Sequence, residues 1–184
     1  MDTQAAWAIL DNAELLHGPT QLEEVLDQMA ATITAKLGDQ FPLVLSVMGG
    51  AVVFTGQLLP RLTFPLEFDY IHVSRYGNHT QGGELRWQKK PQDNVRGRVV
   101  LVLDDILDEG ETMAAIREHV LTQGALAFYS AVFTNKLIKK PKPIQADFVG
   151  LDIPDCYVFG FGMDVHGLWR NLPAIYALKS PADA

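Results

Sequence analysis

Hydrophobic residues in the first part of the chain are spaced as on one face of a helix. The positions are Leu22, Val25, Leu26, Met29 and Ile33. Before them, Thr20 and Glu23 stand three residues apart, the spacing of a capping box at a helix start. Gly38 follows the last apolar position and predicts the helix end. We therefore expect residues 1–40 to form an N-terminal helical segment.

From Pro42 onward, short apolar runs alternate with helical patterns. Runs typical of buried strands cover residues 43–47, 66–73, 99–103 and 126–133, and residues 85–87 fit a returning strand. Helical patterns cover residues 51–59 and 113–123. Strands alternating with helices predict an α/β fold with a mostly parallel central sheet, and we expect residues 1–184 to form one domain. Ligands then bind beyond the carboxyl ends of the strands, after Val47, Val73, Leu103 and Phe133.

Composition narrows the class of protein and the compartment. The 184 residues are 48% hydrophobic, which is enough for a packed core. Cys156 is the single cysteine, so no internal disulfide can form and a reducing compartment is favoured. The first residues do not resemble a signal peptide, and no run approaches the roughly 20 apolar residues of a membrane span. We expect a cytoplasmic protein.

The net charge of −7 argues against general binding of nucleic acid, which needs a basic surface. One basic cluster stands out, because Lys136, Lys139, Lys140 and Lys142 lie within seven residues. For three of these lysines, this pattern favours a solvent-exposed loop.

Candidate chemistry gathers in residues 103–112, between the most apolar strand and a helix. Asp104 and Asp105 supply hard oxygen ligands suited to vicinal hydroxyls or Mg²⁺. Gly110 allows a tight turn in which backbone N–H groups and the helix start can hold a phosphate. Two alternatives are simple helix capping by these acids and a receiver-type phosphoacceptor aspartate. The receiver-type alternative ranks low because a receiver domain carries its paired acids after its first strand, whereas at least two predicted strands precede Asp104 here.

The segment Asp-Asp-Ile-Leu-Asp-Glu-Gly-Glu-Thr at residues 104–112 resembles the diphosphate-sugar binding motif of type I phosphoribosyltransferases. That fold has a mostly parallel sheet flanked by helices, a small hood and a mobile lid loop. The resemblance implies that Asp104 and Asp105 take the ribose 2′- and 3′-hydroxyls, directly or through Mg²⁺. It also implies that Asp108 lies near purine N7 and transfers a proton.

The same resemblance assigns the 5′-phosphate to the backbone that leads into the helix. It implies that N–H groups of Glu109, Gly110, Glu111 and Thr112 bind the phosphate together with the Thr112 hydroxyl. Glu109 and Glu111 depart from the family pattern, which often has neutral or basic residues there. Both carboxylates would repel a phosphate unless they turn outward to water.

Further segments from about Pro42 to Leu172 resemble the hypoxanthine-guanine branch of this family. Met48-Gly49-Gly50 falls at the diphosphate loop, with Met48 where a basic residue is often found; a simple structural turn is an even alternative. Lys136 would place its ammonium on purine O6, which hypoxanthine and guanine have and adenine lacks. The implied reaction joins purine N9 to the ribose of 5-phosphoribosyl diphosphate, giving IMP or GMP plus diphosphate, in purine salvage.

The remaining site residues are also implied by this resemblance. Tyr157 would stack on the base, and the Val158 backbone would bond its edge. Asp164 would join Asp104 and Asp105 in binding Mg²⁺, while Arg170 would bind diphosphate. Arg75 and Tyr76 fall at the lid, where Arg75 replaces a serine.

Several alternatives remain open from the sequence. A xanthine-preferring enzyme is possible because xanthine shares the 6-oxo group that Lys136 would bind. A nucleotide-sensing regulator on the same fold is the rival from a different class, although the acidic balance and the purine-side residues favour the enzyme. We expect a homo-oligomer, either a dimer or a tetramer, that binds small-molecule substrates and neither nucleic acid nor a membrane.

Overall fold

A computed structural model of the chain describes residues 1–75, 85–91 and 95–179 and contains two sheets with four α-helices in these ranges. In chain order the elements are α1 (Thr3–Asp11), β1 (Ala13–His17), α2 (Pro19–Leu37), β2 (Leu43–Met48), α3 (Val52–Leu58), the 3₁₀ turn η1 (Leu59–Arg61), β3 (Glu67–Arg75), β4 (Leu85–Lys89), β5 (Val99–Leu107), α4 (Glu111–Thr122), β6 (Ala127–Leu137), β7 (Phe148–Pro154), β8 (Val158–Phe159) and β9 (Ile175–Leu178).

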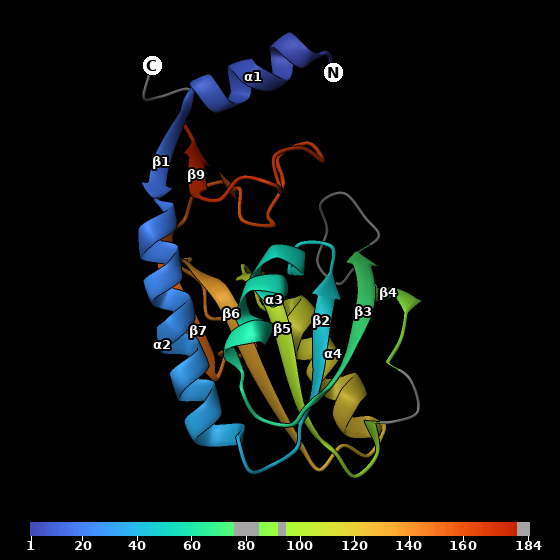
Figure 1. The fold of residues 1–184 in the computed structure, drawn as a ribbon. Helices are drawn as coiled ribbons and strands as arrows, with labels where there is room; N and C mark the ends of the chain where they lie inside the picture. Colours follow the sequence, from blue (N-terminus) through green and yellow to red (C-terminus); the bar gives the residue numbers. More distant parts are fainter. Residues whose placement is uncertain (76–84, 92–94, 180–184) are drawn as a thin grey trace.

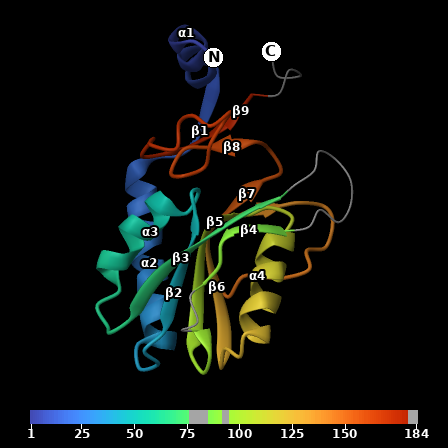
Figure 2. The ribbon, with the colours of Figure 1, turned by 90° about the vertical axis from the view of Figure 1, so that its right-hand side faces the viewer.

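The large sheet has six strands in the order β4-β3-β2-β5-β6-β7. Neighbouring strands are parallel except for β4, which returns antiparallel to β3. Helices α2 and α3 lie on one face and α4 on the other (Figure 2). The expected α/β fold with a mostly parallel sheet is confirmed.

The core consists of two apolar layers, one on each face of this sheet. On one face, α2 and α3 pack Leu26, Ile33 and Phe54 against the strands. On the other, α4 packs Met113, Ile116 and Val120. Strands β2 and β5 are buried on both faces, which explains their nearly continuous apolar sequences.

A three-stranded antiparallel sheet of order β1-β9-β8 forms the expected hood. It stands beyond the carboxyl ends of the parallel strands (Figure 1). Strand β1 comes from the N-terminal segment, so the prediction of an entirely helical 1–40 is wrong at Ala13–His17. This strand has only a weak apolar pattern and forms by pairing with β9, more than 150 residues later.

The start of α2 also differs from the prediction. Gly18 is the N-cap and Pro19 the first helical residue, so Thr20 lies inside the helix and no capping box forms. Proline fits the first turn because the N–H it lacks has no partner there. The predicted end is confirmed, with Gly38 as the C-cap.

Strands β5 and β6 run further than their apolar cores suggest. Their parallel pairing continues to Ile106↔Thr134 and Leu107↔Asn135. Asp104 and Asp105 therefore belong to strand β5, and Lys136 to β6, whereas the sequence placed all three in loops after the strands. Sheet hydrogen bonding thus fixes the backbone of these polar residues.

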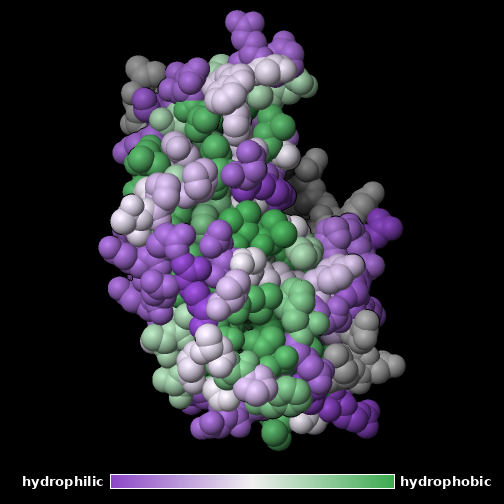
Figure 3. Space-filling view, viewed as in Figure 1, coloured by the Kyte–Doolittle hydropathy of each residue, from purple (hydrophilic) through white to green (hydrophobic). Residues whose placement is uncertain are grey.

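Apolar side chains reach the surface on the face that carries α3 (Figure 3). Val52 on α3 and Phe68 and Tyr70 on β3 are 45%, 45% and 41% exposed. Among the described residues, no helix combines the length and the apolar character needed to cross a membrane.

Candidate active site

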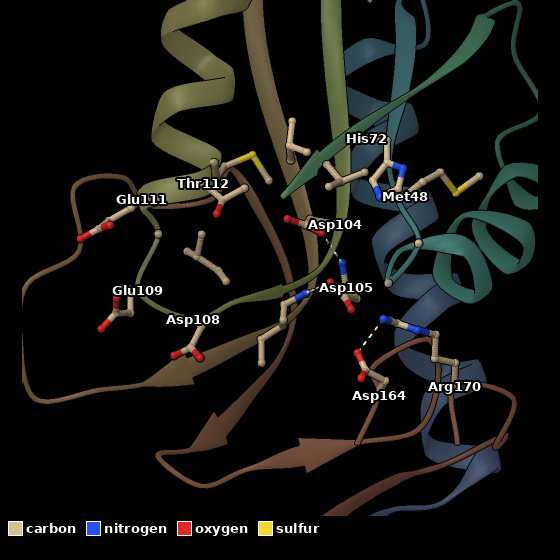
Figure 4. A pocket seen from close by; sticks show the side chains of 18 residues that line it. Met48, His72, Asp104, Asp105, Asp108, Glu109, Glu111, Thr112, Asp164 and Arg170 are labelled. Carbon is tan, nitrogen blue, oxygen red and sulfur yellow. Dashed lines mark hydrogen bonds and ion pairs between the residues drawn. The ribbon is translucent and has the colours of Figure 1, made fainter. Parts of the chain in front are cut away.

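A large cavity lies at the carboxyl ends of β2, β3 and β5, below the hood. It has a volume of about 520 Å³. Its lining includes most of the predicted phosphate and ribose residues (Figure 4). These are Met48, Gly49, Gly50, Asp104, Asp105, Asp108, Glu109, Gly110, Glu111, Thr112, Asp164 and Arg170.

Asp104 and Asp105 line this cavity from strand β5, and their side chains point in different directions (Figure 4). Asp104 Oδ1 accepts the Asp105 N–H at 3.0 Å, and Asp105 Oδ1 accepts the Ile106 N–H at 3.0 Å. Burial raises the pKa of both carboxyls, and the neighbouring Asp105 charge raises the pKa of Asp104 further. Two buried acids of this kind are suited to a divalent cation or to hydroxyl donors.

Gly50 and Gly162 allow close contacts between the Gly49-Gly50 turn, the Asp105 side chain and the hood backbone. A Cβ at position 50 would lie 1.9 Å from Asp105 Oδ2, so only glycine fits against that carboxylate. A Cβ at position 162 would lie 2.0 Å from the Gly50 carbonyl oxygen, so the hood touches the Gly49-Gly50 turn through backbone. The Met48–Gly49 peptide is cis.

The turn before α4 is open to an anion. Gly110 has φ +81° and is the N-cap of α4, and as a glycine it offers no side-chain cap to the helix start. The N–H groups of the first helical turn have no partner within the helix itself, and they lie at the cavity end of α4, where the helix dipole favours negative charge. Thr112 contributes its hydroxyl to the same lining.

Glu109 and Glu111 direct their carboxylates away from Asp104 and Asp105 (Figure 4). Glu109 also forms an ion pair with Lys140. The hydrogen bond to Glu109 raises the pKa of Lys140, and the charges of Glu109, Glu111 and Asp108 add to this effect. Both residues nevertheless belong to the lining of the large cavity.

A smaller cavity of about 200 Å³ adjoins the large one and shares Asp105, Ile106, Asp108 and Asp164 with it. Its other lining residues include the predicted purine residues Lys136, Tyr157 and Val158. Lys136 Nζ lies 2.8 Å from Asp108 Oδ2 and forms an ion pair with it. The predicted base contacts are thus brought together in one place.

Tyr157 and Val158 bound the small cavity from the hood. Tyr157 is 52% exposed, and its hydroxyl donates to the Asp164 carbonyl oxygen at 3.1 Å. Partial burial raises the pKa of the Tyr157 hydroxyl, with a further contribution from the Asp164 charge. Val158 is buried and starts strand β8.

Arg170 and Asp164 form an ion pair at the edge of the large cavity (Figure 4), with Arg170 Nη2 2.6 Å from Asp164 Oδ1. Arg170 Nη1 also donates to the Gly162 carbonyl oxygen at 2.7 Å. Asp164 Oδ2 accepts the Gly167 N–H at 2.8 Å. The guanidinium is therefore held in a defined orientation from the hood.

Sequence reasoning missed three residues that shape the site. His72 lines the large cavity from within β3, opposite Met48 in the parallel pairing. Thr134 donates its hydroxyl to the Asp105 carbonyl oxygen at 2.9 Å. Lys142, expected in solvent, donates to the Leu107 carbonyl oxygen at 2.6 Å and to Asn135 Oδ1 at 2.7 Å.

These three residues carry little signal in a single sequence. A histidine or threonine within a strand gains a site role only once the pairing of strands is known. The prediction of a solvent-exposed loop fails for Lys142, whose pKa is lowered by burial, and Lys140 is tied to Glu109.

Of the two predicted lid residues, Arg75 is the last residue of β3 and pairs with Leu85. Tyr76 lies outside the described residues, as does most of the predicted lid.

Comparison with known proteins identifies related sequences over most of the chain. The family model described as a phosphoribosyl transferase domain matches residues 12–166. The hypoxanthine-guanine phosphoribosyltransferase of Bacillus subtilis is 33% identical over 92% of this chain and 94% of its own length. The hypoxanthine-guanine-xanthine phosphoribosyltransferase of Tritrichomonas foetus is 33% identical over 93% of this chain and 94% of its own length.

Solved structures of phosphoribosyltransferases share the fold. A hypoxanthine phosphoribosyltransferase from Staphylococcus aureus superposes with a TM-score of 0.88 at 25% identity, covering 96% of this chain and 97% of that one. The chain also spans 26% of the length of bifunctional TilS/HprT proteins from Listeria, at 34% identity.

Proposed function

The chain belongs to the family of phosphoribosyl transferase domains, and from that premise we propose that it is a purine salvage enzyme for hypoxanthine and guanine. It would form the bond between purine N9 and ribose C1 of 5-phosphoribosyl diphosphate. The C1–oxygen bond to diphosphate breaks, and the base gives up one proton. The products are IMP or GMP and diphosphate.

The pair of adjoining cavities carries this proposal. The large cavity, with the open start of α4 and the carboxylates of β5, suits a sugar phosphate, and the small one suits a planar base. The residues common to both, including Asp105 and Asp108, mark where sugar and base would meet. In this arrangement the Thr112 hydroxyl and the N–H groups from Glu109 to Thr112 would bind the 5′-phosphate.

The Lys136–Asp108 pair gives a physical reason for a 6-oxopurine. An ammonium donor and a carboxylate acceptor lie 2.8 Å apart at one edge of the small cavity. Guanine and hypoxanthine present the O6 acceptor beside N7, whereas adenine presents an amino donor in place of O6. Lys136 would donate to O6, and Asp108 would accept the proton from N7. Adenine would instead direct its amino group, a hydrogen-bond donor, at the Lys136 ammonium, which is also a donor, so no hydrogen bond could form there.

Mg²⁺ fits the residues of the large cavity. Six carboxylates line it, against one guanidinium, Arg170, and one imidazole, His72, among the described residues. A highly anionic substrate needs positive charge there, and Mg²⁺ is commonly held by one or two carboxylates together with substrate phosphates. Asp104, Asp105 and Asp164 are the carboxylates that would contribute to holding the ion together with substrate oxygens, because the described residues contain no group of three such ligands already placed around one point. When bound, it would supply positive charge to the diphosphate.

The chain's own residues would then act mainly by orientation and charge. The transition state of such a transfer resembles an oxocarbenium ion, which the carboxylates near the ribose stabilise. Arg170 would bind the departing diphosphate through charge-assisted hydrogen bonds. Tyr157 would cover the base, and the backbone of Val158 would bond its edge.

The assay is a direct test of base choice. Purified protein is incubated with 5-phosphoribosyl diphosphate, Mg²⁺ and one of hypoxanthine, guanine, xanthine or adenine, and nucleoside monophosphate is measured. We expect products from hypoxanthine and guanine and none from adenine. Equal turnover of adenine would refute the role of Lys136, and no product from any base would refute the enzyme.

Xanthine is the second candidate substrate. It carries the same 6-oxo group, and the Tritrichomonas foetus relative is named for all three bases. The xanthine arm of the same assay decides between the two activities.

The proposal extends to assembly and location. The exposed apolar side chains of Val52, Phe68 and Tyr70 suit contact with a second copy of the chain, in a dimer or a tetramer. A single cysteine suits a reducing compartment, and we place the reaction in the cytoplasm.

A further inference from the structure

Helix α1 is an addition to the part of the chain that the family model matches. The match begins at residue 12, and α1 ends at Asp11. The helix lies beyond the hood, at the end of the molecule (Figure 1), and buries none of its own residues.

The contact of α1 with the hood centres on Trp169. The Trp7 and Trp169 rings meet edge to face, with centroids 5.1 Å apart and planes at 63°. The Trp169 indole Nε1–H also donates to the Ala6 carbonyl oxygen at 3.1 Å. Both interactions join α1 to a residue more than 160 positions away.

Trp169 has a backbone conformation that needs such support. Its φ is +68°, in the left-handed region, which is a genuine outlier for a bulky residue. Conformations of this kind persist only where surrounding contacts enforce them, and they gather at functional sites. The ring contact and the indole hydrogen bond to α1 are two such contacts.

The next residue is Arg170, which reaches the large cavity. Its carbonyl oxygen accepts the Gly162 N–H at 2.9 Å, and its Nη1 donates back to the Gly162 carbonyl at 2.7 Å. Its Nη2 pairs with Asp164 at 2.6 Å. Because Trp169 directly precedes Arg170, the backbone conformation of Trp169 helps to determine where the Arg170 side chain is anchored.

We propose that α1 is a positioning element for the diphosphate subsite, acting through Trp169 on Arg170. Trp7 and the Ala6 carbonyl hold Trp169 in its left-handed conformation, so that Arg170 is oriented before substrate arrives. A preorganised side chain loses less freedom on binding, and this improves affinity. The inference rests on the proposed role of Arg170 in binding diphosphate.

The test compares three variants of α1 by steady-state kinetics. Trp7→Ala removes the ring contact, Trp7→Phe keeps an aromatic ring, and Gln4→Ala changes an exposed position of the same helix as the control. We expect Trp7→Ala to raise KM for 5-phosphoribosyl diphosphate about two- to tenfold, the effect of freeing one long side chain. KM for hypoxanthine should stay unchanged in all three, and Trp7→Phe should recover most of the loss.

A double-mutant cycle shows whether Trp7 acts through Arg170. In an Arg170→Ala background, Trp7→Ala should have no further effect on KM for 5-phosphoribosyl diphosphate. An equal effect in both backgrounds, or equal rises in both KM values, would mean that α1 only stabilises the fold. That result would overturn the proposal.

Binding of inorganic diphosphate in the presence of Mg²⁺, measured by calorimetry, separates this inference from the proposed reaction. Weaker binding by Trp7→Ala than by the wild type supports positioning even if no purine is converted. Equal binding by the two proteins overturns the positioning role, even if the enzyme is active.

Discussion

At the scale of single residues, Gly50 is the position where the site has least space. Its Cα faces the Asp105 carboxylate on one side, and its carbonyl oxygen meets Gly162 on the other. Alanine at position 50 would push Asp105 away. We expect Gly50→Ala to lower kcat/KM for 5-phosphoribosyl diphosphate by about ten- to a hundredfold, because small displacements of binding groups are costly.

The control for this substitution is Gly56→Ala, within helix α3. A Cβ at position 56 meets nothing within 4 Å, and alanine favours the helix by about 1 kcal/mol. This variant should be at least as stable as the wild type, with unchanged kinetics. If Gly50→Ala were equally active, the contact with Asp105 would have no importance for binding.

Asp108 is the residue to which the proposal gives a proton-transfer role. It is 49% exposed, so its replacement should leave the fold intact. We expect Asp108→Ala to reduce kcat with hypoxanthine by at least about tenfold, since positioned proton transfer contributes about 10²–10⁴-fold. Circular dichroism would confirm folding. An unchanged kcat would remove Asp108 from the mechanism.

At the scale of elements, α4 and β4 meet through His119 and Trp87. Their ring centroids are 4.5 Å apart. Burial lowers the pKa of His119, and the Lys90 charge lowers it further. The unfolded chain therefore binds a proton at this residue more readily than the folded chain does. This contact should lose its contribution to stability as the pH falls below about 6.5, the usual pKa of histidine.

The matched comparison is His119→Gln, which cannot take up that proton. We expect the unfolding free energy of the wild type to fall relative to this variant between about pH 7 and pH 5. Urea denaturation across that range measures the difference. Parallel curves for the two proteins would show that His119 is not desolvated in this contact.

Elements with a strong local pattern could be predicted from the sequence, and those formed by distant pairing could not. The apolar runs of β2 and β5 and the helical spacing of Met113, Ile116 and Val120 indicated the layers of the fold. Strand β1, by contrast, forms only because β9 lies beside it. The strand ends were also missed, since β5 continues through the polar Asp104 and Asp105 by pairing with β6.

The residues of the candidate site also divide into those that a local motif indicated and those that only strand pairing brings into place. Its motif residues could be named from their resemblance to a family, and the structure brings Asp104, Asp108 and Lys136 to one region. His72 reaches that region only through the pairing of β3 with β2, which no single segment encodes.

At the scale of the whole molecule, the apolar surface near α3 is the best indication of assembly. Ile71 and Val73 belong to the layer under α4, so Phe68 and Tyr70 face the other side of β3, where they are exposed. We expect Phe68→Asp to shift the protein toward monomer in light scattering, because a charge at an apolar interface is costly.

Leu126→Asp is the control for this prediction. Leu126 is 73% exposed and lies just before β6. The Leu126→Asp substitution should leave the molar mass of the protein in solution unchanged. An unchanged mass for Phe68→Asp as well would place any subunit contact elsewhere.

The touching backbones of Gly50 and Gly162 bear on how this enzyme could be re-engineered. The hood carries Tyr157 and Val158 together with Asp164 and Arg170, whereas the sheet and its loops carry Lys136, the remaining acids and the phosphate turn. Chimaeras that import a hood from a relative would therefore exchange residues of the base and diphosphate subsites together, and would keep Lys136 and Asp108. Such grafts should tolerate wide sequence divergence elsewhere, provided that the donor hood and the recipient turn each retain glycine at this junction.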